Sequence, residues 1–344
     1  MKNSKFIKAL NLQDNSIPPV WFMRQAGRYL PEYQEIRKNY TNFLDMCKQP
    51  KTCAELALQP IDRFDLDASI LFSDILTIPD ALNLGLSFRE GEGPKFSNPI
   101  SSPQDIKRLT RFDVNSLDYV FKAVEETKKL LPNNLPLIGF CGSPWTLAAY
   151  SIEGGGSKDF NKTKSFMKEH PKELHEFLEI LSNACYEYLR QQVLSGVNAL
   201  QIFDSWADLL LENELEKFSL QYTQRLTSLL KADPVTSNIP IILFEKAQKI
   251  KIDDLVFADI SCVSLYWQED IDRVARKLKN QYAIQGNLDP KVLLESDELI
   301  WNETQKICSI MSEYPGFIFN LGHGITPDID PDKVKFLTDS IREL

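Results

Sequence analysis

The stretch that decides the fold is "PVWFMRQAGRYLPEY", residues 19–33. It begins with the apolar run 19–23, which is typical of a buried strand, and two arginines, Arg24 and Arg28, follow directly. Arginine is rarely buried without a partner, and no acidic residue lies between these two. The pattern therefore predicts a buried strand whose end carries cations that meet either acids from elsewhere in the chain or a ligand.

Seven further short runs of apolar, β-branched or aromatic residues recur along the chain. They are ASILFS (68–73), LPLIGF (135–140), NALQIF (198–203), IPIILF (239–244), CVSLYW (262–267), YAIQG (282–286) and GFIFNL (316–321). Amphipathic stretches that suit helices separate most of them, such as 118–131 and 173–196, and the second of these ends at a glycine. Buried strands that alternate with helices are typical of parallel βα units.

The number of runs indicates the architecture. Eight strands favour an α/β fold in which a single (β/α)8 TIM barrel spans residues 1–344, rather than an open doubly wound sheet. We expect the active-site cleft at the C-terminal strand ends, as in other barrels of this kind. The long segment between the second and third runs includes 86–100, which predicts an additional hairpin.

The composition excludes several classes of function. Of 344 residues, 43% are hydrophobic and 25% are charged, and the net charge is −9. This charge argues against nucleic-acid binding, although a local arginine cluster can still bind an anionic small molecule. The six cysteines are scattered without a C-x-x-C pair, which argues against a disulfide framework or a zinc ribbon. No run approaches the roughly 18 apolar residues of a membrane span, and the start lacks a signal-peptide core, so we expect a cytoplasmic protein without membrane contact.

Polar side chains follow at least five of the runs, where a barrel would gather them at one end. They are Arg24 and Arg28 after the first run, Asp74 after the second, Tyr150 beyond the third, Ser205 after the fourth and His323 after the eighth. Structural explanations stay open for each of them. The arginines could form an ion-pair network, Asp74 and Ser205 could cap helices, and Tyr150 and His323 could pack in the core, although the glycines on both sides of His323 make this less expected.

Two further features do not support a cofactor or metal site. The glycines at 154–156 suit a hinge better than a phosphate loop, because no lysine–serine pair follows them. His170 and His175 are five residues apart, which is the wrong spacing for a shared metal site on one helix face.

Five blocks of sequence together resemble one known family. The blocks are PVWFMRQAGRYLPEY (19–33), LFSDIL (71–76), GFCGSPWTLAAYSIEGG (139–155), QGNLDP (285–290) and FNLGHGITP (319–327). In this order they resemble the uroporphyrinogen decarboxylase family over nearly the whole chain. The resemblance implies a single-domain (β/α)8 barrel, a homodimer, and no cofactor or metal. It also implies removal of the four acetate carboxyls of uroporphyrinogen III, which gives coproporphyrinogen III and carbon dioxide in haem biosynthesis.

The resemblance also implies which residues act. Asp74, Arg28 and Arg37 match the catalytic positions of the family. The substrate-binding positions are matched by Arg24, Gln25, Ala26, Gly27, Arg28, Phe43, Ile70, Asp74, Phe140, Tyr150, Ser205 and His323. Arginine can hold a carboxylate through two parallel hydrogen bonds, and an apolar cleft suits the pyrrole faces. We expect Asp74 to accept hydrogen bonds from the pyrrole N–H groups and to stabilise positive charge as it develops.

The sequence departs from the family at two places. Tyr266, in SLYWQED, stands where the family has an acid, and EKAQKI (245–250) replaces a usual lysine–glycine pair. Two competing functions are a corrinoid or thiol methyltransferase and a non-catalytic tetrapyrrole carrier. The methyltransferases need a His-x-Cys zinc ligand pair, whereas His323 is followed by Gly324 and Ile325.

Overall fold

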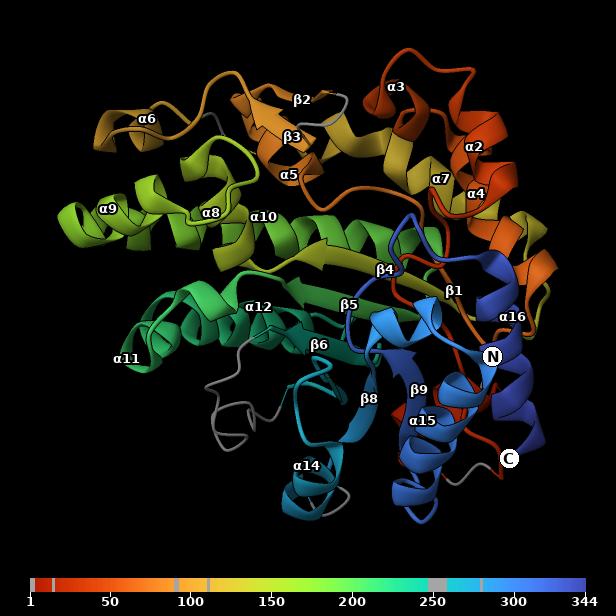
Figure 1. Cartoon of the computed structure of the whole chain (residues 1–344). Helices are drawn as coiled ribbons and strands as arrows, with labels where there is room; N and C mark the ends of the chain where they lie inside the picture. Colours follow the sequence, from red (N-terminus) through yellow and green to blue (C-terminus); the bar gives the residue numbers. More distant parts are fainter. Residues whose placement is uncertain (1–3, 14–15, 90–92, 110–111, 247–258, 279–280) are drawn as a thin grey trace.

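The centre of the fold is a curled seven-stranded sheet in which every strand is parallel to its neighbours (Figure 1). In this computed structural model, the described residues are 4–13, 16–89, 93–109, 112–246, 259–278 and 281–344. The strands are β1 (Ser69–Ile70), β4 (Leu137–Gly142), β5 (Ala199–Asp204), β6 (Ile241–Glu245), β7 (Cys262–Ser264), β8 (Ala283–Leu288) and β9 (Phe317–Leu321), in this order across the sheet. Every residue of β4 to β9 is buried, as expected where both faces of a parallel sheet are covered.

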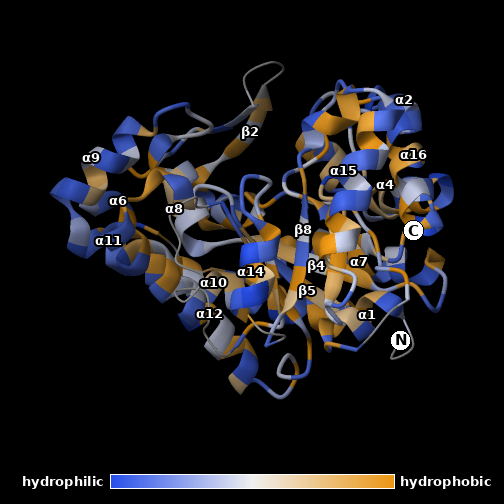
Figure 2. Cartoon of the chain, turned by 60° about the horizontal axis from the view of Figure 1, so that its bottom comes forward, coloured by the Kyte–Doolittle hydropathy of each residue, from blue (hydrophilic) through white to orange (hydrophobic). Residues whose placement is uncertain are grey.

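Helices surround the sheet, and hydrophobic residues gather along the strands and the inner sides of the helices (Figure 2). The described α-helices are α1 (Lys5–Leu10), α2 (Pro31–Arg37), α3 (Phe43–Cys47), α4 (Pro50–Arg63), α5 (Thr77–Pro79), α6 (Pro103–Lys107), α7 (Asp118–Leu130), α8 (Pro144–Glu153), α9 (Asn161–Glu169), α10 (Pro171–Ser195), α11 (Glu212–Leu215), α12 (Gln221–Ala232), α14 (Ile271–Leu278), α15 (Asp297–Ile310) and α16 (Pro331–Glu343). Both predicted amphipathic stretches are helical, as α7 and α10. Gly196 ends α10 with a φ of 115°, a conformation that glycine adopts without strain.

The predicted hairpin is confirmed. It consists of β2 (Leu86–Arg89) and β3 (Gly93–Phe96), which pair antiparallel, while residues 90–92 lie outside the described part of the chain. The glycine-rich segment 154–156 packs against this hairpin through a bridge between Lys95 and Gly155. A Cβ on Gly155 would lie 2.4 Å from the backbone oxygen of Pro94, so close backbone contact accounts for glycine there.

Seven of the eight predicted strands are present, and the first run, 19–23, differs. It forms only an isolated parallel bridge, between Val20 and Phe319. The reason is that side chains, rather than a neighbouring strand, accept hydrogen bonds from its backbone N–H groups. These bonds join Val20 N to Asp67 Oδ2 at 2.8 Å, Phe22 N to Gln25 Oε1 at 3.1 Å, and Met23 N to Asn320 Oδ1 at 3.1 Å.

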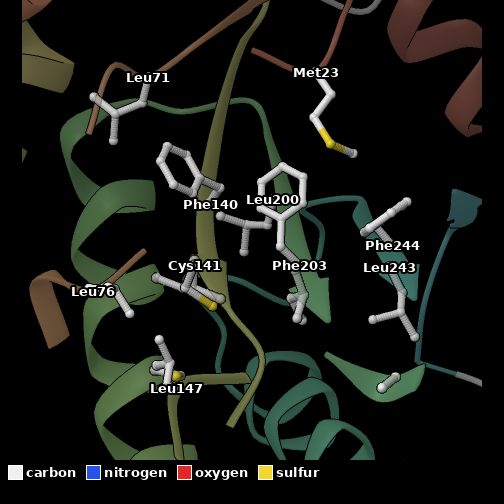
Figure 3. Close-up of a cluster of buried hydrophobic side chains, with 14 of the residues drawn as sticks. Met23, Leu71, Leu76, Phe140, Cys141, Leu147, Leu200, Phe203, Leu243 and Phe244 are labelled. Carbon is white, nitrogen blue, oxygen red and sulfur yellow. The ribbon is translucent and has the colours of Figure 1, made fainter. Parts of the chain in front are cut away.

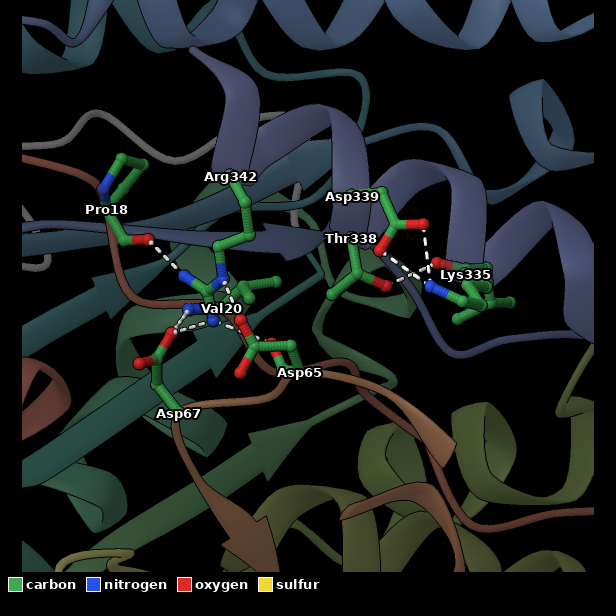
Figure 4. Close-up of polar contacts among 9 residues, drawn as sticks. Pro18, Val20, Asp65, Asp67, Lys335, Thr338, Asp339 and Arg342 are labelled. Carbon is green, nitrogen blue, oxygen red and sulfur yellow. Dashed lines mark hydrogen bonds and ion pairs between the residues drawn. The ribbon is translucent and has the colours of Figure 1, made fainter. Parts of the chain in front are cut away.

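The first run nevertheless lies between the two ends of the sheet. The N–H of Phe319 on β9 donates to Pro19 O at 2.9 Å, and the N–H of Asp67, just before β1, donates to Val20 O at 2.8 Å. Arg342 of α16 holds this junction together (Figure 4). Its guanidinium donates to Asp67 Oδ2 at 2.7 Å and to the side chain of Asp65 at 2.8 Å. The C-terminal helix therefore fixes the segment that precedes the two arginines.

Candidate active site

Asp74 is held by the backbone on one side only. It follows β1 and is half-buried, and its Oδ1 accepts a hydrogen bond from Leu76 N–H at 2.8 Å. Within the described residues, its other carboxylate oxygen accepts no hydrogen bond. Burial raises the pKa of Asp74, and the Leu76 N–H and the positive charge of Arg24 oppose that rise. The turn therefore orients the carboxylate and leaves one oxygen available to a ligand.

The arginines of the opening stretch do not form the ion-pair network that was the structural alternative. The side chains of Arg24 and Arg28 are exposed, and neither pairs with an acid in the described part of the chain. Arg37 is half-buried at the end of α2, and its guanidinium donates to Tyr40 O at 2.6 Å. Arg37 and Arg28 lie near the same phenol, Tyr33. Burial raises the pKa of Tyr33 to about 12, and both arginine charges oppose that rise.

Arg24 adopts an unusual backbone conformation. Its φ is +63°, in the left-handed region that residues with a side chain seldom occupy and that often marks functional sites. Its side chain lies against Gly324, where an added Cβ would come within 2.4 Å of Arg24 Cδ. Gly322 is equally constrained, since a Cβ there would lie 2.2 Å from Trp267 N. The two glycines beside His323 therefore make room for the guanidinium chain and for a neighbouring loop.

The positive charge of Arg24 acts on three other predicted site residues. The charge of Arg24 lowers the pKa values of Asp74, Tyr150 and His323, although burial has the larger effect on each. For His323, burial and the charges of Arg24 and Lys246 lower the pKa to about 4. The imidazole is therefore neutral near pH 7 and can form hydrogen bonds without bringing a charge. We call the surface around Arg24, Asp74, Tyr150, Ser205 and His323 the mouth.

Two groups of aromatic side chains contact one another, one on the central strands and one near the hairpin. On β4 and β5, the rings of Phe140 and Phe203 are 5.8 Å apart, and Phe203 continues to Phe244 at 6.2 Å. These three belong to the cluster drawn in Figure 3. In the second group, Phe43 lies 4.8 Å from Phe88 of the hairpin, and a further ring, Phe72, lies 6.2 Å from Phe43. Phe43, Phe72 and Phe88 are all half-buried, whereas Phe140, Phe203 and Phe244 are buried in the core.

The remaining residues of the arginine stretch have internal contacts. Gln25 is buried, and its Nε2 donates to Ala68 O at 3.2 Å, so its side chain supports the loop rather than facing the mouth. Ala26 and Gly27 are half-buried, and a Cβ on Gly27 would lie 3.3 Å from Arg24 O. Ile70, at the end of β1, is half-buried and packs against both hydrophobic clusters of the core.

Two neighbouring residues at the end of β5, Asp204 and Ser205, differ in burial and in hydrogen bonding. Asp204 is fully buried and accepts hydrogen bonds from Thr146 Oγ1, at 2.7 Å, and from Ser219 Oγ, which ties β5 to two helical segments. Ser205 is half-buried, and its hydroxyl forms no hydrogen bond with any described residue. The next helical turn begins with Trp206 as its N-cap, so the capping alternative for Ser205 is not supported. The ring of Trp206 packs against that of Tyr150, with the two ring centres 5.7 Å apart.

Sequence reasoning did not identify Lys246 as a site residue. It follows β6 directly, and its Nζ lies 2.9 Å from Asp208 Oδ2 and 5.3 Å from the centre of the Trp206 ring. The only sequence signal was its place after an apolar run, in the segment 245–250. The rest of that segment, 247–250, lies outside the described residues. Tyr266, the other departure from the family, has its ring 6.3 Å from that of His323.

No group of three or more His, Cys, Asp or Glu side chains among the described residues is placed to hold a metal ion. No helix in that part of the chain combines the length and the apolar character needed to cross a bilayer.

The fold and the mouth define a TIM-barrel-like α/β protein with one oriented carboxylate and two exposed arginines that pair with no acid among the described residues. The family model for uroporphyrinogen decarboxylase (URO-D) matches residues 1–344. A uroporphyrinogen decarboxylase from Ruthia magnifica is 47% identical over 98% of both chains, and one from Neisseria meningitidis is 43% identical over 100% of this chain and 97% of its own. The chain therefore belongs to the uroporphyrinogen decarboxylase family.

Solved structures of distant proteins share the fold. A methyltransferase from Methanosarcina mazei has a TM-score of 0.81 and 16% identity, and the match covers 99% of this chain and 98% of that one. A B12-independent methionine synthase from Shewanella has a TM-score of 0.53 and 12% identity, with 86% and 88% coverage. At such identities the likeness concerns the fold alone.

Proposed function

We propose that this chain removes the four acetate carboxyls of uroporphyrinogen III, which gives coproporphyrinogen III and four molecules of carbon dioxide. Membership of the family and full-length relatives of 43% to 48% identity support this activity. The observation that carries the proposal is the Asp74 carboxylate, with one oxygen fixed by Leu76 N–H and the other unbonded among the described residues, beside unpaired Arg24. A ring of pyrrole N–H donors that bears carboxylates at its rim fits this arrangement.

The arginines bind the rim of the substrate. The macrocycle carries eight carboxylates, and guanidinium groups hold carboxylates through paired, charge-assisted hydrogen bonds. Arg24 and Arg28 are exposed, and neither is paired with a described acid, so both can take such a carboxylate without first losing an internal partner. Tyr150, Ser205 and His323 orient further arms, while Phe43 and Phe140 contact the pyrrole faces.

Decarboxylation needs an electron sink, and the substrate's own pyrrole ring serves as one. Protonation of the ring carbon next to the one that bears the acetate arm gives a cationic ring, with positive charge shared by the carbon that carries the arm. The bond between the acetate CH2 and its carboxyl carbon then breaks. Its electron pair forms a double bond from the CH2 to the ring and neutralises the ring charge. Carbon dioxide is released, and an exocyclic methylene remains. A proton added to the methylene forms the methyl group, and loss of the first proton restores the pyrrole. Asp74 stabilises the cationic stage from the centre of the macrocycle.

The proton source is assigned to the arginine side of the mouth. Arg28 and Arg37 are the candidates, although a guanidinium holds its proton tightly and is a weak acid. A water molecule or a substrate carboxyl that they orient is the alternative donor. Arg37→Lys separates the two: if the residue at position 37 is the acid, the alkaline limit of kcat moves to lower pH with lysine, whereas an oriented water or substrate carboxyl leaves that limit unchanged.

Gly324→Ala is expected to weaken substrate binding while it leaves the protein folded. The added methyl group displaces the Arg24 side chain, whose Cδ would lie 2.4 Å from it. KM for uroporphyrinogen III should rise about tenfold, which corresponds to roughly 1.4 kcal/mol. Gly156→Ala is the matched control, because an added Cβ there meets nothing within 4 Å. Equal KM values for the two variants in steady-state assays would contradict the packing role of Gly324.

The same proposal includes closure of the barrel, the oligomeric state and the location of the protein in the cell. The run 19–23 takes the eighth position of a closed (β/α)8 barrel, supported by its backbone hydrogen bonds on both sides. The protein works as a cytoplasmic homodimer, as the family resemblance implies. Sedimentation velocity tests this state, and a monomer at micromolar concentration would contradict it.

One experiment tests the activity. The purified chain is incubated with uroporphyrinogen III under reducing conditions, and the products are oxidised to porphyrins and separated by carboxyl number. We expect a four-carboxyl product. Bound but unchanged substrate would instead indicate a carrier, and zinc in the purified protein would favour the methyltransferase alternative.

A further inference from the structure

Lys246 stands across the mouth from the opening arginines. It follows β6, and the sheet order places three strands between β6 and the first run in either direction, namely β1, β4 and β5 on one side and β7, β8 and β9 on the other. A macrocycle that carries carboxylates all around its rim presents arms to both sides. The opening stretch supplies cations to one side only.

The surroundings of Lys246 hold its ammonium group in place without using all its donors. Trp206 and Tyr266 present their rings at 5.3 Å and 5.8 Å from Nζ, and cation–π contact favours a charge at such positions. Asp208 Oδ2 forms an ion pair with Nζ at 2.9 Å. An ammonium has three N–H donors, so a second acceptor can be added without loss of the first. The side chain is 20% exposed, so the ammonium is partly desolvated.

The position of Lys246 is tied to the mouth through His323. The Tyr266 ring lies 5.8 Å from Nζ and 6.3 Å from the imidazole of His323. The charges of both Lys246 and Arg24 lower the pKa of that imidazole, after the larger effect of burial. Lys246 and Arg24 therefore act on the same ring from two different parts of the fold.

We propose that Lys246 is a second cationic anchor, which binds a carboxylate arm of the macrocycle opposite the arginines, with Trp206 and Tyr266 beside it and Asp208 as its partner in the free protein. This inference rests on the proposed function for the identity of the ligand. The substrate must present four different pyrroles to the same carboxylate in turn. Anchors on both sides of the mouth hold each partly decarboxylated species in the site for the next step.

Three variants and one control test the anchor. Lys246→Met removes the charge and keeps an unbranched chain, Lys246→Arg restores the charge, and Asp208→Asn removes the internal partner of Lys246. Lys231→Met is the control, because Lys231 lies near the end of α12, which leads into the amino end of β6, and donates to the backbone oxygen of Ser237. Each protein is assayed for KM, for the distribution of seven-, six- and five-carboxyl products, and for Tm.

We expect Lys246→Met to raise KM about tenfold and to increase the share of released intermediates, while Lys246→Arg recovers most of both losses. Asp208→Asn should leave KM unchanged or lower it, because the ammonium loses a competing carboxylate. A merely structural ion pair predicts another pattern, in which Lys246→Met and Asp208→Asn lower Tm alike and leave KM and product distribution as in the control. That pattern would overturn the proposal.

A binding measurement separates this inference from the proposed activity. Affinity for uroporphyrinogen III is followed by quenching of tryptophan fluorescence in the wild type and in Lys246→Met. If the wild type binds the macrocycle without releasing carbon dioxide, the proposed decarboxylase activity is wrong. About tenfold weaker binding by Lys246→Met would still support the anchor. Equal affinities of the two proteins, or no binding by the wild type, would refute it.

Discussion

Asp74→Asn is expected to remove most of the turnover and to leave the fold intact. The asparagine Oδ1 can still accept the hydrogen bond from Leu76 N–H, so the turn after β1 is preserved. The negative charge that stabilises the cationic pyrrole is lost, and the new NH2 group opposes the pyrrole N–H donors. Loss of a preorganised electrostatic contact at a transition state costs on the order of 3 kcal/mol, so kcat/KM should fall at least a hundredfold.

The control for this variant is Asp80→Asn. Asp80 is half-buried and also uses one carboxylate oxygen to accept a backbone N–H, from Leu86 at 2.8 Å. Both variants should show similar Tm values near that of the wild type, whereas only the change at position 74 should reduce kcat/KM. Near-normal turnover by Asp74→Asn would exclude a central carboxylate from the mechanism.

The sequence predicts the strands well because a buried parallel strand is a local pattern. Seven apolar runs became β1 and β4 to β9, since each contains enough consecutive apolar residues to be covered on both faces. The first run has the same pattern and forms only one bridge. Its N–H groups bond to Asp67 and Asn320, which are 47 and 297 residues away in sequence. Such distant side-chain acceptors leave no mark within a run of five residues.

The candidate site was predictable where a charged residue ends a strand and was missed where its surroundings decide. Asp74 and His323 follow apolar runs, and the structure places both near Arg24. Gln25 lies beside Arg24 in sequence, yet its side chain turns inward to the backbone of Ala68. Lys246 also follows a strand directly, but the two rings beside its ammonium come from different loops, and the sequence does not show that contact.

Arg28→Lys is expected to impair substrate binding although the positive charge is kept. The Arg28 side chain is exposed and has no acidic partner among the described residues, so its replacement leaves the fold unaffected. A guanidinium holds a carboxylate with two parallel N–H bonds, whereas an ammonium is a point charge that cannot reproduce this fork. Loss of one charge-assisted hydrogen bond costs about 1.5–3 kcal/mol, so KM should rise roughly tenfold to a hundredfold.

Arg63→Lys is the comparison that isolates the carboxylate of the substrate. Arg63 also carries a partly exposed guanidinium, but it pairs with Glu32 at 3.4 Å and with Asp332 at 3.6 Å, so it meets acids of the protein itself. Its replacement by lysine should leave KM for uroporphyrinogen III unchanged, because surface pairs of this kind contribute little and do not contact the ligand. If Arg28→Lys kept the KM of the wild type, the opening arginine stretch would attract the substrate by charge alone. The proposed paired hydrogen bonds at position 28 would then be wrong.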